Sequence, residues 1–257
     1  EALETTKIHS VAGKLKGTEG IIYRRPFMTP HHTASSVSII GGGQSAKPGI
    51  VSLAHNGVLF LDEMPEYPRS VLESLRQPLE DRVITVTRVK ANLEYPASFM
   101  LIGSMNPCPC GYYGSKDKEC SCSPFQIKKY REKISGPLLD RVDIRINVDS
   151  VKYDELIGDG EAESSTEVRK RVNRTRAIQL ERFKGEGITS NAEMSEKHLK
   201  KYCRLSPECE AILKSAFDSL KLSARARSRI IKVARTIADM ELSEQIESKH
   251  LLEAISY

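Results

Sequence analysis

The chain has 257 residues, 39% of them hydrophobic, which is enough to bury one core, or a core and a small satellite domain. No apolar run approaches the roughly 18 residues that a membrane span needs, and the acidic Glu1 and Glu4 do not resemble a secretory leader, so we expect a cytoplasmic protein without a membrane partner. The formal charge of +5 is compatible with phosphate-bearing ligands but does not demonstrate nucleic-acid binding.

The first half of the chain alternates short β-branched runs with helical segments, which is typical of an α/β domain with a largely parallel sheet. Apolar periodicity and turn residues define the separate elements. In chain order we expect a fully buried strand at 57–63, a helix at 67–81 with Val71, Leu72 and Leu75 inward, a hairpin at 83–97, a second buried strand at 99–106 and a third strand at 143–148.

The second half differs in composition. Residues 151–165 are acidic, contain glycine and lack periodicity, which indicates a linker. Beyond them, apolar residues recur at helical spacing near 165–184, 195–203, 206–220, 223–241 and 247–256, and Ser206-Pro207 is a good helix start. The expected organisation is an α/β core over 1–150, the linker at 151–165 and a small helical domain over 166–257.

Two adjacent carboxylates, Asp62 and Glu63, end the first expected strand. The carboxyl edge of the sheet is where α/β proteins bind ligands. An aspartate at this position holds Mg²⁺ in nucleotide hydrolases, and the next acid can polarise the water that attacks the γ-phosphate. The plain alternative is a strand followed by an acidic helix start, which needs no ligand.

Three more polar residues can contribute to such a site. Asn106 stands at the tip of the second expected strand, where its amide can orient water or a phosphate oxygen. Arg141 stands at the start of the third and suits an arginine finger that reaches a neighbouring subunit's nucleotide, unless it pairs with Asp140 or Asp143. Arg225, in the helical half, can contact the nucleotide from the side of a lid.

Four of the six cysteines form two C-x-C pairs separated by nine residues: Cys108, Cys110, Cys120 and Cys122. Without an export signal they argue against a disulfide scaffold. Four thiolates in a cytosolic loop suit a structural Zn²⁺ site, although C-x-C is a rarer spacing than C-x₂-C. Free reduced thiols and a redox pair are the alternatives.

The histidines and the basic runs carry weaker signals. His31 and His32 have no acidic or cysteine partner at ligand spacing, so we expect a structural or hydrogen-bonding role for them. The basic runs at 169–176 and 221–235 have the composition of solvated helix faces, and for 169–176 we favour that interpretation.

Five segments together carry a resemblance to a known family. They are RPFMTPHHTAS (25–35), GIVSLAHNGVLFLDEMPE (49–66), GSMNPCPCGYYG (103–114), KISGPLLDRVDI (133–144) and LSARARSRIIKVARTIADM (222–240). With them the chain resembles the AAA+ ATPases of the magnesium-chelatase-related group and, within that group, the ComM/YifB family.

The resemblance implies roles for individual residues. Asp62 and Glu63 match the Walker B pair, Asn106 sensor 1, Arg141 the arginine finger and Arg225 sensor 2. It also implies ATP and Mg²⁺ as cofactors and a homo-hexameric ring.

The hairpin at 83–97 matches the pre-sensor hairpin of the family, which points towards the central pore of ring motors. Arg88 and Lys90 are therefore candidates for gripping a threaded DNA strand, with a simply solvated basic tip as the equal alternative.

One motif of the family is missing. The phosphate-binding pattern G-x-x-x-x-G-K-[ST] occurs nowhere, and the glycine-rich stretch at 38–49 has Lys47 without the required spacing or the following Ser or Thr. The resemblance implies that the Walker A strand, loop and helix precede residue 1. We therefore expect an AAA+ P-loop-type core without its Walker A part, followed by an all-α lid, and a fragment that hydrolyses ATP poorly or not at all.

Three functions remain open at this stage. The resemblance implies a ComM-type ring motor, a helicase for branch migration in natural transformation and recombination. The alternatives are the motor subunit of a metal-chelatase-type complex and a non-catalytic assembly module. Salt-sensitive DNA binding would separate the first from the second, and a full-length protein that also lacks a Walker A motif would favour the third.

Overall fold

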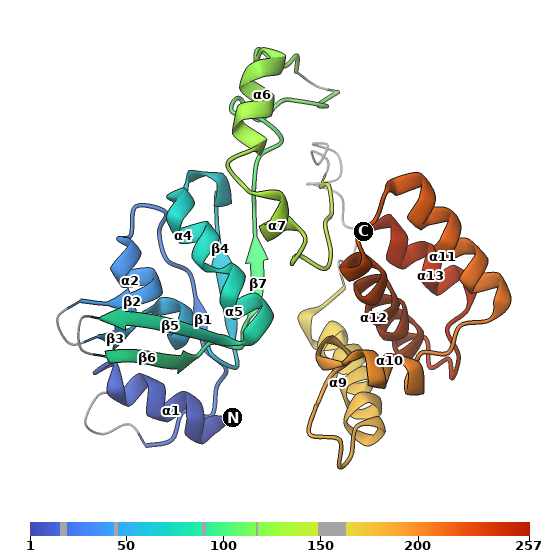
Figure 1. The fold of residues 1–257 in the computed structure, drawn as a ribbon, viewed down its shortest axis with the longest axis horizontal. Helices are drawn as coiled ribbons and strands as arrows, with labels where there is room; N and C mark the ends of the chain where they lie inside the picture. Colours follow the sequence, from blue (N-terminus) through green and yellow to red (C-terminus); the bar gives the residue numbers. More distant parts are fainter. Residues whose placement is uncertain (16–19, 44–45, 89–90, 117, 149–162) are drawn as a thin grey trace. The chain divides into compact units, whose positions relative to one another are not determined.

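The computed structural model describes residues 1–15, 20–43, 46–88, 91–116, 118–148 and 163–257 (Figure 1). Internal contacts divide the chain into two compact units, Glu1–Val142 and Asp143–Tyr257. The linker expected at 151–165 falls mostly on residues 149–162, outside the described part, so the linker and the domain boundaries around it stay predictions. Among the described residues, no helix is long and apolar enough to cross a membrane.

The first unit is a mixed α/β body. Its main sheet has three parallel strands in the order β1-β4-β7, and two two-stranded antiparallel pairs, β2-β3 and β5-β6, accompany it. The elements are α1 (Ala2–Val11), β1 (Phe27–Met28), α2 (Ser36–Ile40), β2 (Gly41–Gly42), β3 (Lys47–Pro48), α3 (Ile50–Leu53), β4 (Val58–Leu61), the 3₁₀ helix η1 (Met64–Glu66), α4 (Arg69–Ser74), α5 (Arg76–Asp81), β5 (Val83–Arg88), β6 (Ala91–Pro96), β7 (Met100–Gly103), α6 (Pro124–Arg131) and α7 (Gly136–Leu139).

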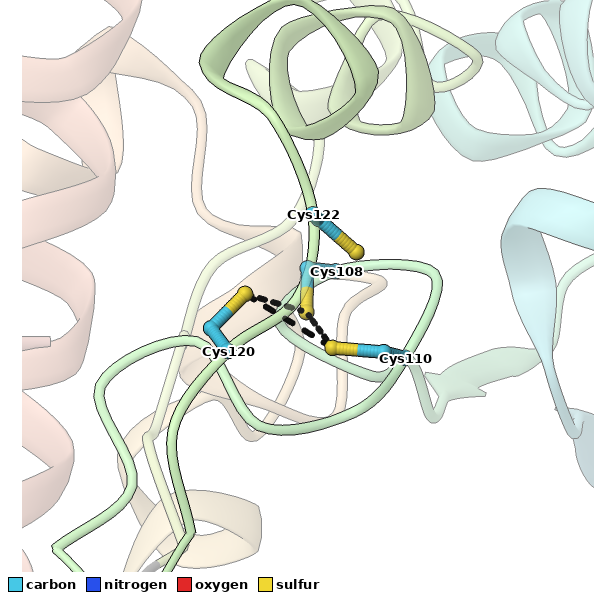
Figure 2. A group of neighbouring side chains, drawn as sticks. All are labelled: Cys108, Cys110, Cys120 and Cys122. Atoms are coloured by element: carbon cyan, nitrogen blue, oxygen red, sulfur yellow. Dashed lines mark hydrogen bonds between the residues drawn. The ribbon is translucent and has the colours of Figure 1, made fainter.

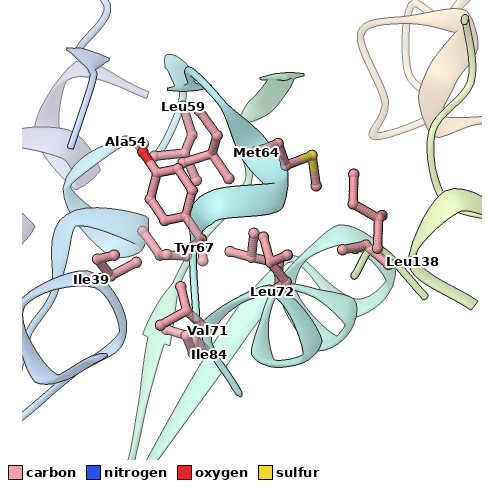
Figure 3. Close-up of a cluster of buried hydrophobic side chains, with 14 residues drawn as sticks. Ile39, Ala54, Leu59, Met64, Tyr67, Val71, Leu72, Ile84 and Leu138 are labelled. Atoms are coloured by element: carbon pink, nitrogen blue, oxygen red, sulfur yellow. The ribbon is translucent and has the colours of Figure 1, made fainter. Parts of the chain in front are cut away.

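One face of the main sheet packs on the core of this unit (Figure 3). Leu59 and Leu61 of β4 point into a buried cluster with side chains from the helical segment that follows, as the sequence predicts for Val71, Leu72 and Leu75. The expected single helix at 67–81 is broken into α4 and α5 at Leu75. The break agrees with Pro78, which has no N–H for the carbonyl four residues before it and whose ring crowds that carbonyl.

The other face of the sheet is apolar but uncovered. The strand register puts Phe27, Val58 and Met100 side by side on this face, with Phe60 and Ile102 one step further along. Phe27 is 61% exposed, Met100 63% and Ile102 41%. Parallel sheets normally bury both faces, so these side chains form a surface that the described part of the first unit leaves open.

Three of the sequence-based expectations for the strands need correction. The strand β4 is half-buried on one face rather than buried throughout. The second strand, β7, is largely exposed, because Met100 and Ile102 lie on the uncovered face of the sheet. No strand forms at 143–148, where Ile144 and Ile146 are exposed and no described strand pairs with the segment. The hairpin at 83–97 is confirmed as β5 paired with β6.

The second unit is helical, as expected from its apolar spacing. Ser206 caps its helix by accepting from the backbone N–H of Cys209 at 3.2 Å, with Pro207 in the first turn. Apolar side chains from the helices meet in one buried cluster that includes Ile231, Ala234 and Ile237. The elements are α9 (Ser165–Arg182), the 3₁₀ helix η2 (Asn191–Glu193), α10 (Glu196–Tyr202), α11 (Pro207–Leu220), α12 (Ala224–Met240) and α13 (Ser248–Ser256).

A buried ion network crosses this helical unit. Asp239 of α12 is 1% exposed and accepts from Arg235 Nε at 3.1 Å, from Arg182 Nη1 at 2.7 Å and from Asn191 Nδ2 at 2.8 Å. Arg235 is 2% exposed and also donates to the carbonyl of Glu244 at 2.9 Å. Arg235 is therefore an internal cross-link of the unit, although the sequence places it in the basic run that suggests a solvated face.

We predict that Asp239→Ala destabilises the second unit by about 3–5 kcal/mol, because it leaves the buried Arg235 without its counter-charge. Urea unfolding followed by circular dichroism measures the change. The control is Asp218→Ala on the exposed face of α11, which we expect to stay within about 0.5 kcal/mol of the parent chain. Equal effects of the two substitutions would contradict the structural role of the network.

Candidate nucleotide site and cysteine cluster

The carboxyl ends of β4 and β7 bring polar residues together. Asp62 and Glu63 follow β4, and Ser104 follows β7 in the paired register. The backbone N–H of Glu63 lies 3.1 Å from Ser104 Oγ and 3.1 Å from Asp62 Oδ1, and the Ser104 hydroxyl donates to the same Asp62 oxygen. One oxygen of Asp62 is thus held in place, while the exposed carboxylate keeps its second oxygen for a further ligand.

Glu63 occupies an unusual backbone conformation. Its φ of 50° and ψ of 47° are left-handed, a region that costs energy for a residue with a side chain. The conformation turns the chain directly into η1, where the N–H of Met64 donates to the carbonyl of Ser104 at 2.9 Å. The backbone strain therefore falls on the residue whose carboxylate the sequence predicts to activate water.

One of the two histidines for which the sequence predicts a structural or hydrogen-bonding role lies beside Glu63. His32 Nδ1 is 3.5 Å from Glu63 Oε2, and the two rings of His31 and His32 lie 4.2 Å apart. The Tyr67 hydroxyl donates to the carbonyl of Pro30 and so anchors the turn that carries both histidines. The acidic partner of His32 could not be found from spacing in the sequence, because it comes from a different strand.

Asn106 lies at the rim of a small pocket next to Glu63. Other walls of this pocket come from η1 with Glu66 and from α6 with Tyr130. Lys133 also lines the pocket, and its Nζ forms an ion pair with Glu66 Oε1 at 3.0 Å. The pocket therefore combines carboxylates, an amide and an ammonium group, which suits a polar ligand that bears phosphate and a cation. Glu66, Tyr130 and Lys133 carry no distinctive signal in the sequence.

Arg141 is engaged within its own chain. It follows α7, and its guanidinium pairs with Glu80 of α5 and donates from Nη1 to the carbonyl of Pro137 at 2.6 Å. The side chain is only 12% exposed. The carboxylate beside Arg141 is thus one that the sequence does not single out, and a role in a neighbouring subunit's site requires that Arg141 leaves Glu80.

The remaining nucleotide and DNA candidates stay predictions. Arg225 lies in the first turn of α12 in the second unit, so no distance from Asp62 follows from the structure. Arg88 ends β5, and Lys90 lies outside the described residues.

The four clustered cysteines do converge, as their sequence spacing suggests. Figure 2 shows the thiols of Cys108, Cys110, Cys120 and Cys122 pointing towards one another from the loop between β7 and α6. All four Sγ atoms lie within 4.8 Å of one another.

The thiols of the cluster differ in acidity. The backbone N–H of Tyr112 lowers the pKa of Cys110 to about 5, while burial raises the pKa of Cys122 to about 12. The hydrogen bond from Tyr112 thus favours the thiolate of Cys110, and burial favours the protonated thiol of Cys122. Donors of this kind suit a soft divalent metal ion, whose charge stabilises several thiolates at once.

Comparison with known proteins gives matches over nearly the whole chain. The family model described as magnesium chelatase, subunit ChlI, matches residues 1–156, and the model of the C-terminal part of that subunit matches residues 162–257. The chain is 42% identical over its full length to competence protein ComM of Haemophilus influenzae and 41% identical to the uncharacterized protein YifB of Salmonella typhimurium. It covers 49% and 50% of these relatives, so it spans about half their length.

We predict that Ser104→Ala destabilises the first unit by about 1–2 kcal/mol, because it removes the hydroxyl that bridges Asp62 and the N–H of Glu63. Thermal unfolding of the two chains in parallel measures the loss. Ser70→Ala on the exposed start of α4 is the matched control and should be near neutral. A Ser104→Ala chain as stable as the control would mean that the bridge contributes nothing.

Proposed function

The chain belongs to the magnesium chelatase subunit ChlI family, and on that premise we propose that it supplies the metal-holding and water-activating half of an ATP-hydrolysing AAA+ site. The observation that carries this proposal is the meeting of Asp62, Glu63 and Ser104 at one edge of a parallel sheet, with Asn106 beside them. In α/β proteins this edge is the place of ligand binding.

The residues present fit a magnesium ion. Asp62 offers an exposed carboxylate oxygen, a ligand that Mg²⁺ prefers, in a carboxylate already oriented by Ser104. When bound, Mg²⁺ would neutralise charge on the phosphate oxygens of ATP. Glu63 would accept a proton from the attacking water, and the amide of Asn106 would orient that water or a phosphate oxygen.

His32 is suited to hold Glu63 in this arrangement. It approaches the carboxylate from the turn after β1. The carboxylate has free rotation about its side-chain bonds, so a fixed neighbour reduces the number of orientations it samples. We propose that His32 is a positioning residue and does not itself contact the substrate.

The phosphate-gripping half must come from residues outside these 257. The chain contains no G-x-x-x-x-G-K-[ST] pattern. The uncovered apolar face of the sheet, with Phe27, Met100 and Ile102, supports the proposal, because a further helix packed there would bury it. The half-length match to the relatives is compatible with such additional residues.

We predict that the 257-residue chain alone does not turn over Mg²⁺-ATP, whereas a chain extended upstream through a phosphate-binding loop does. A fluorescent ATP analogue titrated into both forms, followed by phosphate release, measures binding and turnover separately. In the extended form, Glu63→Gln should lower the rate of hydrolysis by about 10²–10⁴-fold, since it removes the base. Nucleotide binding should change little.

The control for this experiment is Glu94→Gln on the exposed surface of the hairpin, which removes a carboxylate away from the site. It should hydrolyse ATP at the parent rate. Equal nucleotide binding by the short and the extended chain would contradict the divided site, and unchanged hydrolysis in Glu63→Gln would contradict the role of Glu63.

For the assembled protein we propose a homo-hexameric ring motor that acts on DNA, with Arg141 and Arg225 completing the nucleotide site. The similarity to a protein named for competence supports DNA as the client. If Arg141 acts between subunits, mixing extended Arg141→Ala chains with extended Glu63→Gln chains should restore part of the hydrolysis that each lacks alone. No recovery would contradict action between subunits.

A second candidate follows from the family description, which names magnesium chelatase. In that case the motor would drive a metal-inserting complex, and DNA would not bind. Measurements of single-stranded DNA affinity at several salt concentrations distinguish the two, because phosphate contacts give a steep salt dependence. Substitution of Arg88 and Lys90 by Ala should reduce that slope if the hairpin holds the strand.

A non-catalytic assembly module would bind neither nucleotide nor DNA, even in the extended form.

A further inference from the structure

The cysteine cluster lies outside the chemistry proposed for Asp62 and Glu63. It belongs to the segment that joins Asn106, after β7, to the start of α6. Figure 1 shows this segment and α6 projecting beyond the end of β7, away from the sheet. A segment that projects from the sheet in this way needs an interaction that keeps it folded.

The segment has no apolar core of its own. Cys108 is fully buried, while the other described residues between 107 and 123 are exposed or half-buried, among them Tyr112 and Tyr113. Ordering a stretch of this length costs conformational entropy that so little burial cannot offset. Small structural units in this situation are stabilised by disulfides or by metal ions.

The sulfur spacing distinguishes between these two solutions. Cys108 Sγ lies 3.4 Å from Cys110 Sγ and 3.7 Å from Cys120 Sγ. The Sγ atoms of Cys110 and Cys120 are 3.6 Å apart. A disulfide needs about 2.0 Å between its sulfur atoms. Four thiolates at about 2.3 Å around a tetrahedral Zn²⁺ are about 3.8 Å from one another. The observed distances agree with the metal site.

Neighbouring groups support the cluster in the way expected of metal thiolates. The backbone N–H of Tyr113 donates to Cys108 Sγ at 3.3 Å, and bonds of this type orient ligating sulfur atoms. Arg131 of α6 lies 4.8 Å above the ring of Tyr113 and donates from Nε to the carbonyl of Pro107 at 3.2 Å. The loop is therefore connected to α6 on both sides of the first cysteine pair.

We propose that Cys108, Cys110, Cys120 and Cys122 bind one structural Zn²⁺ that holds this loop and, through it, keeps α6 beside Asn106. Binding replaces the remaining S–H protons by metal–sulfur bonds and releases those protons to solvent, so no oxidant is required. Tyr130 of α6 and Asn106 line the same pocket as Glu63. The position of α6 therefore affects the site of ATP hydrolysis, a consequence that rests on the proposed function. The metal site itself does not depend on it.

The first test is the metal content of the protein, purified without a histidine tag and desalted after incubation with zinc. Elemental analysis should find about one zinc per chain. In Cys110→Ser and Cys122→Ser the bound zinc should fall about tenfold or more. Cys203→Ser is the matched control, because Cys203 is a buried thiol of the second unit, and it should retain the parent zinc content.

The second test addresses the loop directly. Trypsin can cleave after Lys116 and Lys118, which lie between the two cysteine pairs. Removal of zinc with a chelator, or the substitution Cys122→Ser, should speed cleavage at these sites about tenfold or more, since the loop then opens locally. Cleavage within the second unit should keep its rate, which shows that the chain remains folded.

Several results would overturn the proposal. They are a parent chain that takes up no zinc, iron with visible absorbance in place of zinc, and a mass that corresponds to disulfides under reducing purification. Zinc binding without any change in tryptic cleavage after its removal would overturn the structural role. An extended protein that binds zinc but does not hydrolyse ATP would count against the proposed function alone.

Discussion

Parallel pairing of β4 with β7 is the constraint on which the rest of the first unit depends. In this register Leu61 lies opposite Gly103, so both strands reach the same edge together and Asp62 meets Ser104. A side chain at Gly103 would meet the sulfur of Met64 at 2.9 Å, so the glycine lets η1 turn back over the end of β7. A shift of the register by one residue would exchange the two faces of the strand and separate the two polar groups.

The same sheet explains why the chain has one well-packed side and one open side. Its core face is filled by α4, α5 and the hairpin, whereas the face with Phe27 and Met100 remains exposed. An apolar surface of this kind is costly in water. Further residues packed on this surface would stabilise the first unit and, under the proposed function, would also supply the phosphate contacts.

The two ends of the site are stabilised by different means. Near Glu63 the backbone is held at the edge of the sheet by hydrogen bonds with Ser104, which can support a strained left-handed residue. The wall of the pocket that α6 forms has little apolar burial. It depends on the cysteine loop and on the ion pair between Lys133 and Glu66. The second unit uses a third solution, a buried carboxylate, Asp239, shared by two arginines.

The sequence by itself determined the helices of the second unit, the hairpin, the core residues after Tyr67 and the grouping of the four cysteines, because these depend on local periodicity and spacing. Only the tertiary structure decided which partners meet across the chain: His32 with Glu63, Arg141 with Glu80, and Arg182 with Asp239 in the interior. It also decided that β7 pairs with a strand along one edge only, among the described residues, and that 143–148 is not a strand. Pairing and burial depend on contacts between distant segments, and no local pattern of residues encodes them.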